Sequence, residues 1–133
     1  MKSQEGFSLS RRLGTVSIAG VLVFGVLVSA QPDPRRMSGI PLPDPQLSTG
    51  TISVRVIRGQ MSNNVADHPV ELTQGDELVT VNTDADGRAT FLMLDPGSSA
   101  SVSTVLDGVR LDSQQFSVPN QGGIRLLLVG EDV

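Results

Sequence analysis

The chain has 133 residues, a formal net charge of -4 and no cysteine, tyrosine or tryptophan. This length allows one small domain with appendages. The lack of cysteine excludes a disulfide framework, a thiolate metal site and a cysteine nucleophile. A core must therefore be built from aliphatic side chains.

The charge is unevenly distributed along the chain. From Gly50 to the end there are five arginines against eleven acidic residues, a local balance of -6. Because such a surface repels phosphate, we expect no nucleic-acid partner.

Residues 1–30 are predicted to be a signal peptide or a membrane anchor. Leu13–Ala30 holds no charge over 18 residues, and as a helix it would be about 27 Å long, close to the ~30 Å hydrocarbon thickness. Small residues at Val28-Ser29-Ala30 favour cleavage before Gln31. The alternative is a retained inner-membrane anchor. Both versions export the rest of the chain to the periplasm or the cell exterior.

Residues 31–50 are expected to form a Pro-rich linker. Five of the eight prolines lie here, and proline removes a backbone donor and fixes φ. The composition predicts an extended spacer between the N-terminal segment and the module that follows.

Residues 51–130 carry the pattern of an all-β domain without helices. In TISVRVIR, apolar Ile52, Val54 and Val56 alternate with polar residues, the period of a strand with one buried face. We expect seven strands, at Thr51–Arg58, His68–Thr73, Glu77–Thr83, Arg88–Leu94, Ser98–Leu106, Val109–Val118 with a break near Asp112, and Gly123–Val129. Short strands separated by Gly-rich and Asp-rich turns predict a seven-stranded Ig-like or prealbumin-like β-sandwich.

The last predicted strand, GIRLLLV, is a nearly continuous apolar run. Such a run ordinarily indicates a central strand that is buried on both faces. The alternative is an exposed edge that a second chain would cover.

The stretch NTDADGRATFLML could be mistaken for a calcium loop. With Gly87 at the sixth position, Asn82, Asp84 and Asp86 occupy positions one, three and five. Position twelve is Met93, which cannot replace the bidentate glutamate. We therefore expect a turn in which the aspartates bond local backbone amides and Gly87 is left-handed, and no metal or cofactor site.

The module resembles the carboxypeptidase regulatory-like domain, a prealbumin-like sandwich of exported bacterial proteins. The resemblance covers Gly50 to about Val129, and its most specific parts are TDADGRATF at Thr83–Phe91 and LDPG at Leu94–Gly97. It implies a seven-stranded sandwich with a non-catalytic accessory or adhesion-type role, and it implies no ligand.

The chain lacks a recognisable catalytic constellation. His68 is the only histidine, and there is no Gly-x-Ser-x-Gly motif. We expect His68 at a strand edge, and the serines of Ser98–Ser103 at solvent-facing positions. The chain is accordingly predicted not to be an enzyme.

The predicted function is a structural or protein-binding module at the bacterial cell envelope, with an envelope protein as partner. The membrane is a second partner through residues 13–30 if these are not cleaved. The alternative function is binding of carbohydrate or another small envelope ligand, which the absence of Trp and Tyr disfavours. The oligomeric state is left open.

Overall fold

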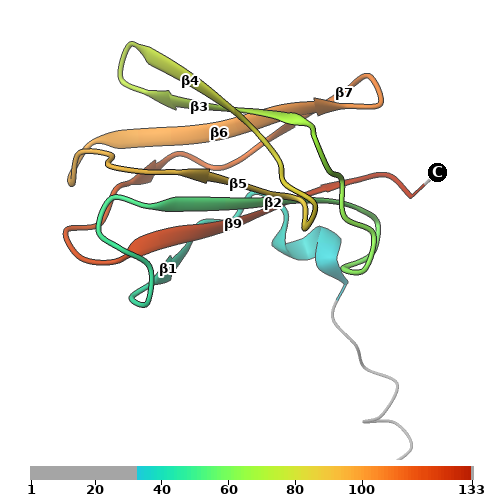
Figure 1. The fold of residues 1–133 in the computed structure, drawn as a ribbon, viewed down its shortest axis with the longest axis horizontal. Coiled ribbons are helices and arrows are strands. Elements are labelled where there is room, and N and C mark those ends of the chain that lie inside the picture. The colour runs from blue at the N-terminus through green and yellow to red at the C-terminus, as the bar shows by residue number, and fades with distance from the viewer. Residues whose placement is uncertain (1–32, 133) are drawn as a thin grey trace, which may run out of the picture. The chain divides into compact units, whose positions relative to one another are not determined.

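The computed structural model describes residues 33–132, which form nine β-strands and one short 3-10 helix (Figure 1). The elements are η2 (Pro34–Met37), β1 (Leu42–Asp44), β2 (Ile52–Arg58), β3 (Pro69–Gln74), β4 (Glu77–Asn82), β5 (Arg88–Phe91), β6 (Ser99–Leu106), β7 (Val109–Asp112), β8 (Phe116–Ser117) and β9 (Gly123–Gly130). The prediction of a mostly β chain is confirmed.

Two sheets face each other as the layers of a sandwich (Figure 1). Sheet A has the strand order β1-β9-β2-β5, and sheet B has the order β4-β3-β6-β7, with β8 also pairing with β6. All pairs are antiparallel except β2 with β9. Parallel neighbours need a long connection, and here the whole of β3 to β8 lies between them.

The core lies between the sheets and is built by period-two alternation. On β2, Ile52, Val54 and Val56 are fully buried, whereas Ser53 and Arg55 lie on the outer face of sheet A. Next to β2 in the same sheet, β9 adds Ile124, Leu126 and Leu128, and the facing sheet B supplies Val70, Leu72, Val102 and Leu106. The core is thus almost wholly aliphatic, as the composition predicts.

The apolar run on β9 lies inside sheet A, between β1 and β2. Leu126 and Leu128 are buried in the core, and Val129 is 8% exposed. A Cβ atom added to Gly123 would lie 2.2 Å from the carbonyl oxygen of Thr51, so the neighbouring backbone leaves no space for a side chain there. The interior position of this strand is confirmed, and the alternative of an exposed edge is wrong. Burial on both faces is only partial, because Arg125 is exposed and Leu127 is half-buried on the outer face.

The number of strands differs from the expected seven. The predicted strand Val109–Val118 is divided into β7 and β8, because Ser113 bonds to β6 through both its side chain and its backbone. The backbone N–H of Val102 donates to Ser113 Oγ at 2.9 Å, and the N–H of Ser113 donates to the Val102 carbonyl at 2.9 Å.

From Asp33 to Gly50, the structure differs from the expected extended spacer. Leu42–Asp44 forms the edge strand β1, paired with β9, and the N–H of Gly39 donates to the Leu127 carbonyl at 2.7 Å. The proline count argued against a strand, but an edge strand tolerates proline because one side of it needs no donor. Pro43 occupies such a position.

The predicted N-terminal helix at residues 13–30 lies outside the described residues. Among residues 33–132, no helix has the length and apolar character needed to cross a membrane.

Candidate functional site

The segment around Asp84 forms a tight turn that carries the chain from β4 in sheet B to β5 in sheet A. Asp84 Oδ1 accepts hydrogen bonds from the backbone N–H groups of Asp86 at 2.8 Å and Arg88 at 3.0 Å. Gly87 has φ +77° and donates its N–H to the Asp84 carbonyl. This geometry confirms the turn.

One detail of the predicted turn is wrong. The carboxylate of Asp86 makes no hydrogen bond with the described residues. The strand that follows ends at Phe91, so Met93 lies beyond it with φ +64° and 89% exposure. Among residues 33–132, no three His, Asp or Glu side chains converge as a metal site would require.

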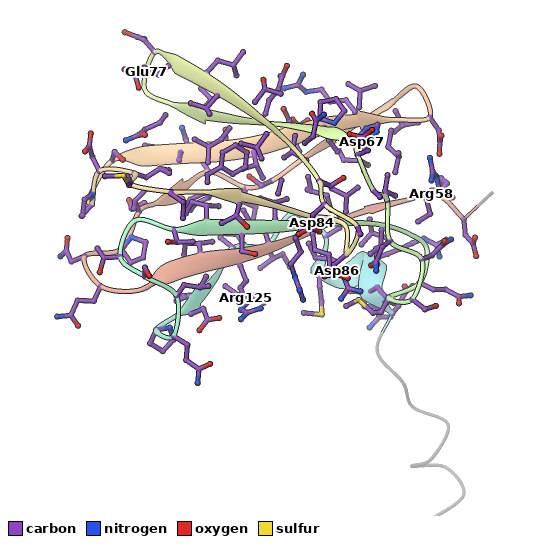
Figure 2. The ribbon with its side chains drawn as sticks, in the orientation of Figure 1. Arg58, Asp67, Glu77, Asp84, Asp86 and Arg125 are labelled. Carbon is purple, nitrogen blue, oxygen red and sulfur yellow. The ribbon has the colours of Figure 1, made fainter. Side chains whose placement is uncertain are left out.

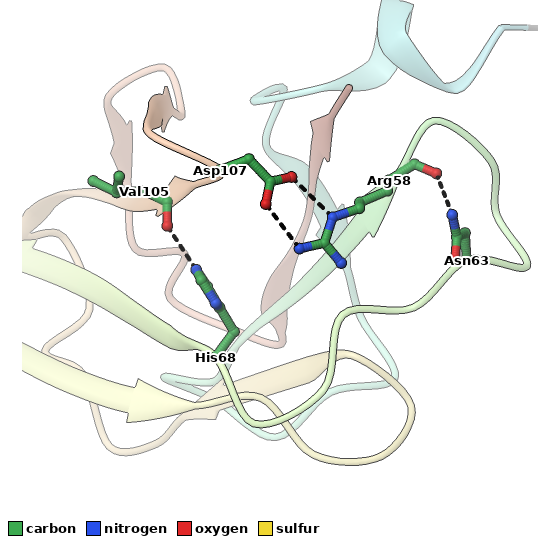
Figure 3. Close-up of polar contacts among 5 residues, drawn as sticks. All are labelled: Arg58, Asn63, His68, Val105 and Asp107. Carbon is green, nitrogen blue, oxygen red and sulfur yellow. Dashed lines mark hydrogen bonds and ion pairs between the residues drawn. The ribbon is translucent and has the colours of Figure 1, made fainter. Parts of the chain in front are cut away.

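His68 is half-buried and contacts a backbone carbonyl. Its Nε2 lies 2.7 Å from the carbonyl oxygen of Val105 (Figure 3), so this nitrogen is the donor. The backbone N–H of His68 donates to Thr83 Oγ1 at 2.9 Å. These contacts join the start of β3 to β6 and to Thr83, the residue that follows β4. The role of His68 that they indicate is structural.

The serines of β6 only partly match the expected exposure. Ser99 is exposed and Ser101 is half-buried, but Ser103 is 8% exposed. Ser103 points away from the core yet lies between β3 and β7, opposite Glu71 and Asp112. Neighbouring strands on both sides cover it, which the alternation of a single strand cannot predict.

A bidentate ion pair closes one end of the sandwich. Arg58 Nε donates to Asp107 Oδ2 at 2.9 Å, and a second guanidinium nitrogen donates to Oδ1 at 3.1 Å (Figure 3). These hydrogen bonds lower the pKa of Asp107 and raise that of Arg58. The pair joins β2 to the β6–β7 turn, so it connects the two sheets.

The most accessible apolar part of the sandwich is its β4–β5 side. β4 is an edge strand that pairs only with β3, and its residues are exposed except for half-buried Val81. Leu78 is 60% exposed and Val79 45% exposed. Figure 1 shows the β3–β4 hairpin splaying away from β5 toward its tip.

Val79 and Val81 point toward the interior of the sandwich, because they pair with core residues Leu72 and Val70 on β3. Between them and the end of β5 is a cleft, here called the edge cleft. It is lined by Leu72, Gln74, Glu77, Val79, Val81, Thr90, Phe91, Leu92, Met93 and Leu94. Seven of these ten side chains are apolar, so the edge cleft can accept apolar side chains of a ligand.

The other edge strands are less suited to pairing with a further strand. β1 has three residues and contains Pro43, β5 has four residues and carries Arg88, and β7 has four residues and carries Arg110 and Asp112. Proline, charge and short length are the features that protect sheet edges. β4 has six residues, no proline and a single charged side chain at Glu77.

An edge strand presents unpaired backbone donors and acceptors, and an adjacent apolar cleft can hold side chains of an added strand. The edge cleft contains neither histidine nor serine, so a nucleophile paired with a base is not found there. Its arrangement suits the binding of an extended segment with apolar side chains.

No motif in the sequence marks this side of the molecule as a binding site. The alternation in ELVTVN predicts a strand but not its position at an edge. Two features of the sequence relate to this side. Apolar and polar residues alternate only weakly in Glu77–Asn82, and Phe91–Leu94 is an uninterrupted apolar run.

Comparison of the chain with models of protein families, with curated proteins and with solved structures finds no match.

Proposed function

We propose that this chain is a non-catalytic, exported β-sandwich module of the bacterial cell envelope that binds a protein partner at β4. The observation that carries the proposal is the exposed six-residue edge strand beside the edge cleft. An extended segment of the partner would pair with the free edge of β4 and place alternate side chains in the cleft. Membership of the carboxypeptidase regulatory-like family is part of this proposal and is supported by the turn motif at Thr83–Phe91.

The alternative of a carbohydrate-binding module has less support from the site. Sugar rings usually stack on exposed aromatic faces, and the one aromatic residue of the edge cleft, Phe91, is 3% exposed.

Site-specific photo-crosslinking in cells tests the proposal. A photoreactive amino acid is placed at Val79 or Met93 in the edge cleft, and at Val105 as a control with similar exposure to Val79. We expect adducts with one envelope protein from Val79 and Met93, none from Val105, and loss of the adduct when Val79→Lys is combined with the probe at Met93. Equal labelling from Val105, or labelling that survives Val79→Lys, would contradict strand addition at β4.

A further inference from the structure

The outer face of sheet A holds a pair of arginines. Arg55 on β2 lies directly opposite Arg88 on β5, and like charges at such positions destabilise a sheet. The Arg55 guanidinium donates to neutral acceptors, Asn64 Oδ1 at 2.7 and 3.1 Å and the Met61 carbonyl at 2.6 Å. Within residues 33–132, neither arginine forms an ion pair with a carboxylate. The arrangement leaves positive charge available to an external anion.

Apolar side chains surround this pair. Met37, Ile40, Leu42 and Met61 are 37–46% exposed, and they line a shallow hollow with Ser53, Arg55, Arg88, Arg125, Leu126 and Leu127. We call this surface the arginine face. The hollow has a volume of about 190 Å³.

Among the described residues, the arginines without an ion pair gather on one side of the sandwich. Arg58, Arg110 and Arg125 are paired with Asp107, Asp112 and Asp44. The four arginines without such a pair are Arg35, Arg36, Arg55 and Arg88, and they lie on the arginine face or on η2, which Figure 1 shows against the outer side of sheet A. Sheet B and its hairpin carry Glu71, Asp76 and Glu77 instead. Figure 2 shows Glu77 and Arg125 at opposite ends of the layered structure.

The acidic turn beside the arginine pair forms no ion pair with it. Asp84 lies in that turn, but its carboxylate oxygen is bonded to backbone amides. Neither Asp84 nor Asp86 lies within ion-pair distance of Arg55 or Arg88. A net acidic module can therefore approach an anionic surface with sheet A foremost.

We propose that the arginine face docks on a bilayer containing anionic phospholipid. Guanidinium groups bind phosphate by paired hydrogen bonds, basic residues near a membrane surface each contribute about 1 kcal/mol on anionic lipid, and exposed apolar side chains enter the headgroup boundary. A soluble anion would use the arginines but not the four apolar side chains around them. This surface is separate from the edge cleft, so the proposal does not depend on the proposed protein-binding function.

The position of the arginine face along the chain agrees with this occupant. Met37, the first residue of the arginine face, follows Ala30, the end of the charge-free segment, by only seven residues, a reach of at most ~25 Å. A retained anchor would hold the face beside the bilayer, and a cleaved chain would dock reversibly.

The test uses the full chain reconstituted into vesicles of phosphatidylcholine alone or with phosphatidylglycerol. The chain has no cysteine, so a single cysteine at Met61 or Val105 can carry an environment-sensitive fluorophore. We expect the label at Met61 to enter the lipid only in anionic vesicles and to return to water at high salt. The label at Val105, on the outer face of sheet B, should stay in water in both vesicle types.

Matched arginine variants complete the test. Each arginine is expected to change the docking equilibrium about fivefold, from ~1 kcal/mol per residue. Arg55→Gln with Arg88→Gln should therefore weaken docking roughly 25-fold, whereas Arg110→Gln on sheet B should leave it unchanged. If the double variant does not fold, Arg88→Gln alone is used, since the Arg88 side chain makes no hydrogen bond with the described residues.

Three results would overturn the proposal. The label at Met61 could stay in water on anionic vesicles, the arginine variants could dock like the parent, or the label at Val105 could enter the lipid equally. A response of the Met61 label to soluble polyglutamate but not to vesicles would identify an acidic polypeptide as the occupant instead.

Discussion

At the scale of single residues, Asp84 organises the link between the sheets through one carboxylate oxygen. That oxygen accepts from two backbone N–H groups, at Asp86 and Arg88. Asp84→Ala should lower the free energy of unfolding by about 1–2 kcal/mol, since two hydrogen bonds to a charged acceptor are lost. Chemical denaturation measures this, with Asp86→Ala as the control in the same turn.

The aspartates of this turn also allow a test of calcium binding. We expect millimolar Ca²⁺ to leave the thermal unfolding midpoint unchanged, because a ligand that binds only the folded state would raise it. A rise in the midpoint that is abolished by Asp84→Ala would show that the aspartates hold the cation.

The Arg58–Asp107 pair predicts a pH dependence. Hydrogen bonds from Arg58 lower the pKa of Asp107 in the folded protein, while the unfolded chain has the ordinary value of about 3.9. The stabilisation is complete above that value and is lost as the pH falls through the lower folded pKa. The free energy of unfolding should therefore decline on acidification below about pH 4.

Asp107→Asn should flatten this decline. Asn suits the left-handed backbone at position 107, where φ is +53°, so the variant changes the charge and keeps the turn. Urea titrations from neutral to acidic pH measure the effect, with Asp86→Asn as the control. If the free energy of unfolding of the variant declined on acidification as much as that of the parent, the Arg58–Asp107 pair would not be the cause of the decline. The pKa of Asp44 is also lowered, by its hydrogen bond from Arg125, so some decline should persist.

At the scale of elements, β9 holds sheet A together because it pairs with both β1 and β2. Leu128 on this strand is fully buried in the core. Leu128→Ala should destabilise the fold by about 2–5 kcal/mol, the usual cost of emptying such a position. Leu78→Ala on the edge strand β4, where the side chain is 60% exposed, should cost under about 0.5 kcal/mol. Equal costs in denaturant titrations would contradict the assigned core.

The strands that could be predicted from the sequence are those with a buried face. Ile52, Val54 and Val56 alternate with polar residues and β9 is apolar except for Arg125, so local pattern and tertiary position agree there. The predicted turns also agree, since Gly75, Gly87, Gly97, Gly108 and Gly122 all have positive φ.

The elements that the sequence could not predict depend on their neighbours. β1 has only three residues, one of them proline, and exists because β9 offers it a free edge. The sequence predicts the break near Asp112 between β7 and β8 but not its contact, because Ser113 bonds to Val102, a residue of another strand. The positions of the edge cleft and the arginine face depend on which strands lie at the edges of each sheet. The alternation of residues within one strand does not indicate its place in the sheet.

At the scale of the whole molecule, export is tested by the mass of the mature protein. The pattern at Val28-Ser29-Ala30 predicts a chain that begins at Gln31. Mass spectrometry of the protein from the cell envelope should give that mass. An intact chain beginning at Met1 in the membrane fraction would support the retained anchor instead.

The molecule as a whole is proposed to bind a protein through one free sheet edge, and hydrogen exchange tests this most directly. With the partner identified by crosslinking, amide exchange is measured across residues 33–132 with and without it. We expect added protection at Glu77–Asn82 and no change at Val109–Asp112, because only the first strand would gain hydrogen bonds from an added strand. Protection confined to other strands, with unchanged exchange at β4, would contradict the proposed function.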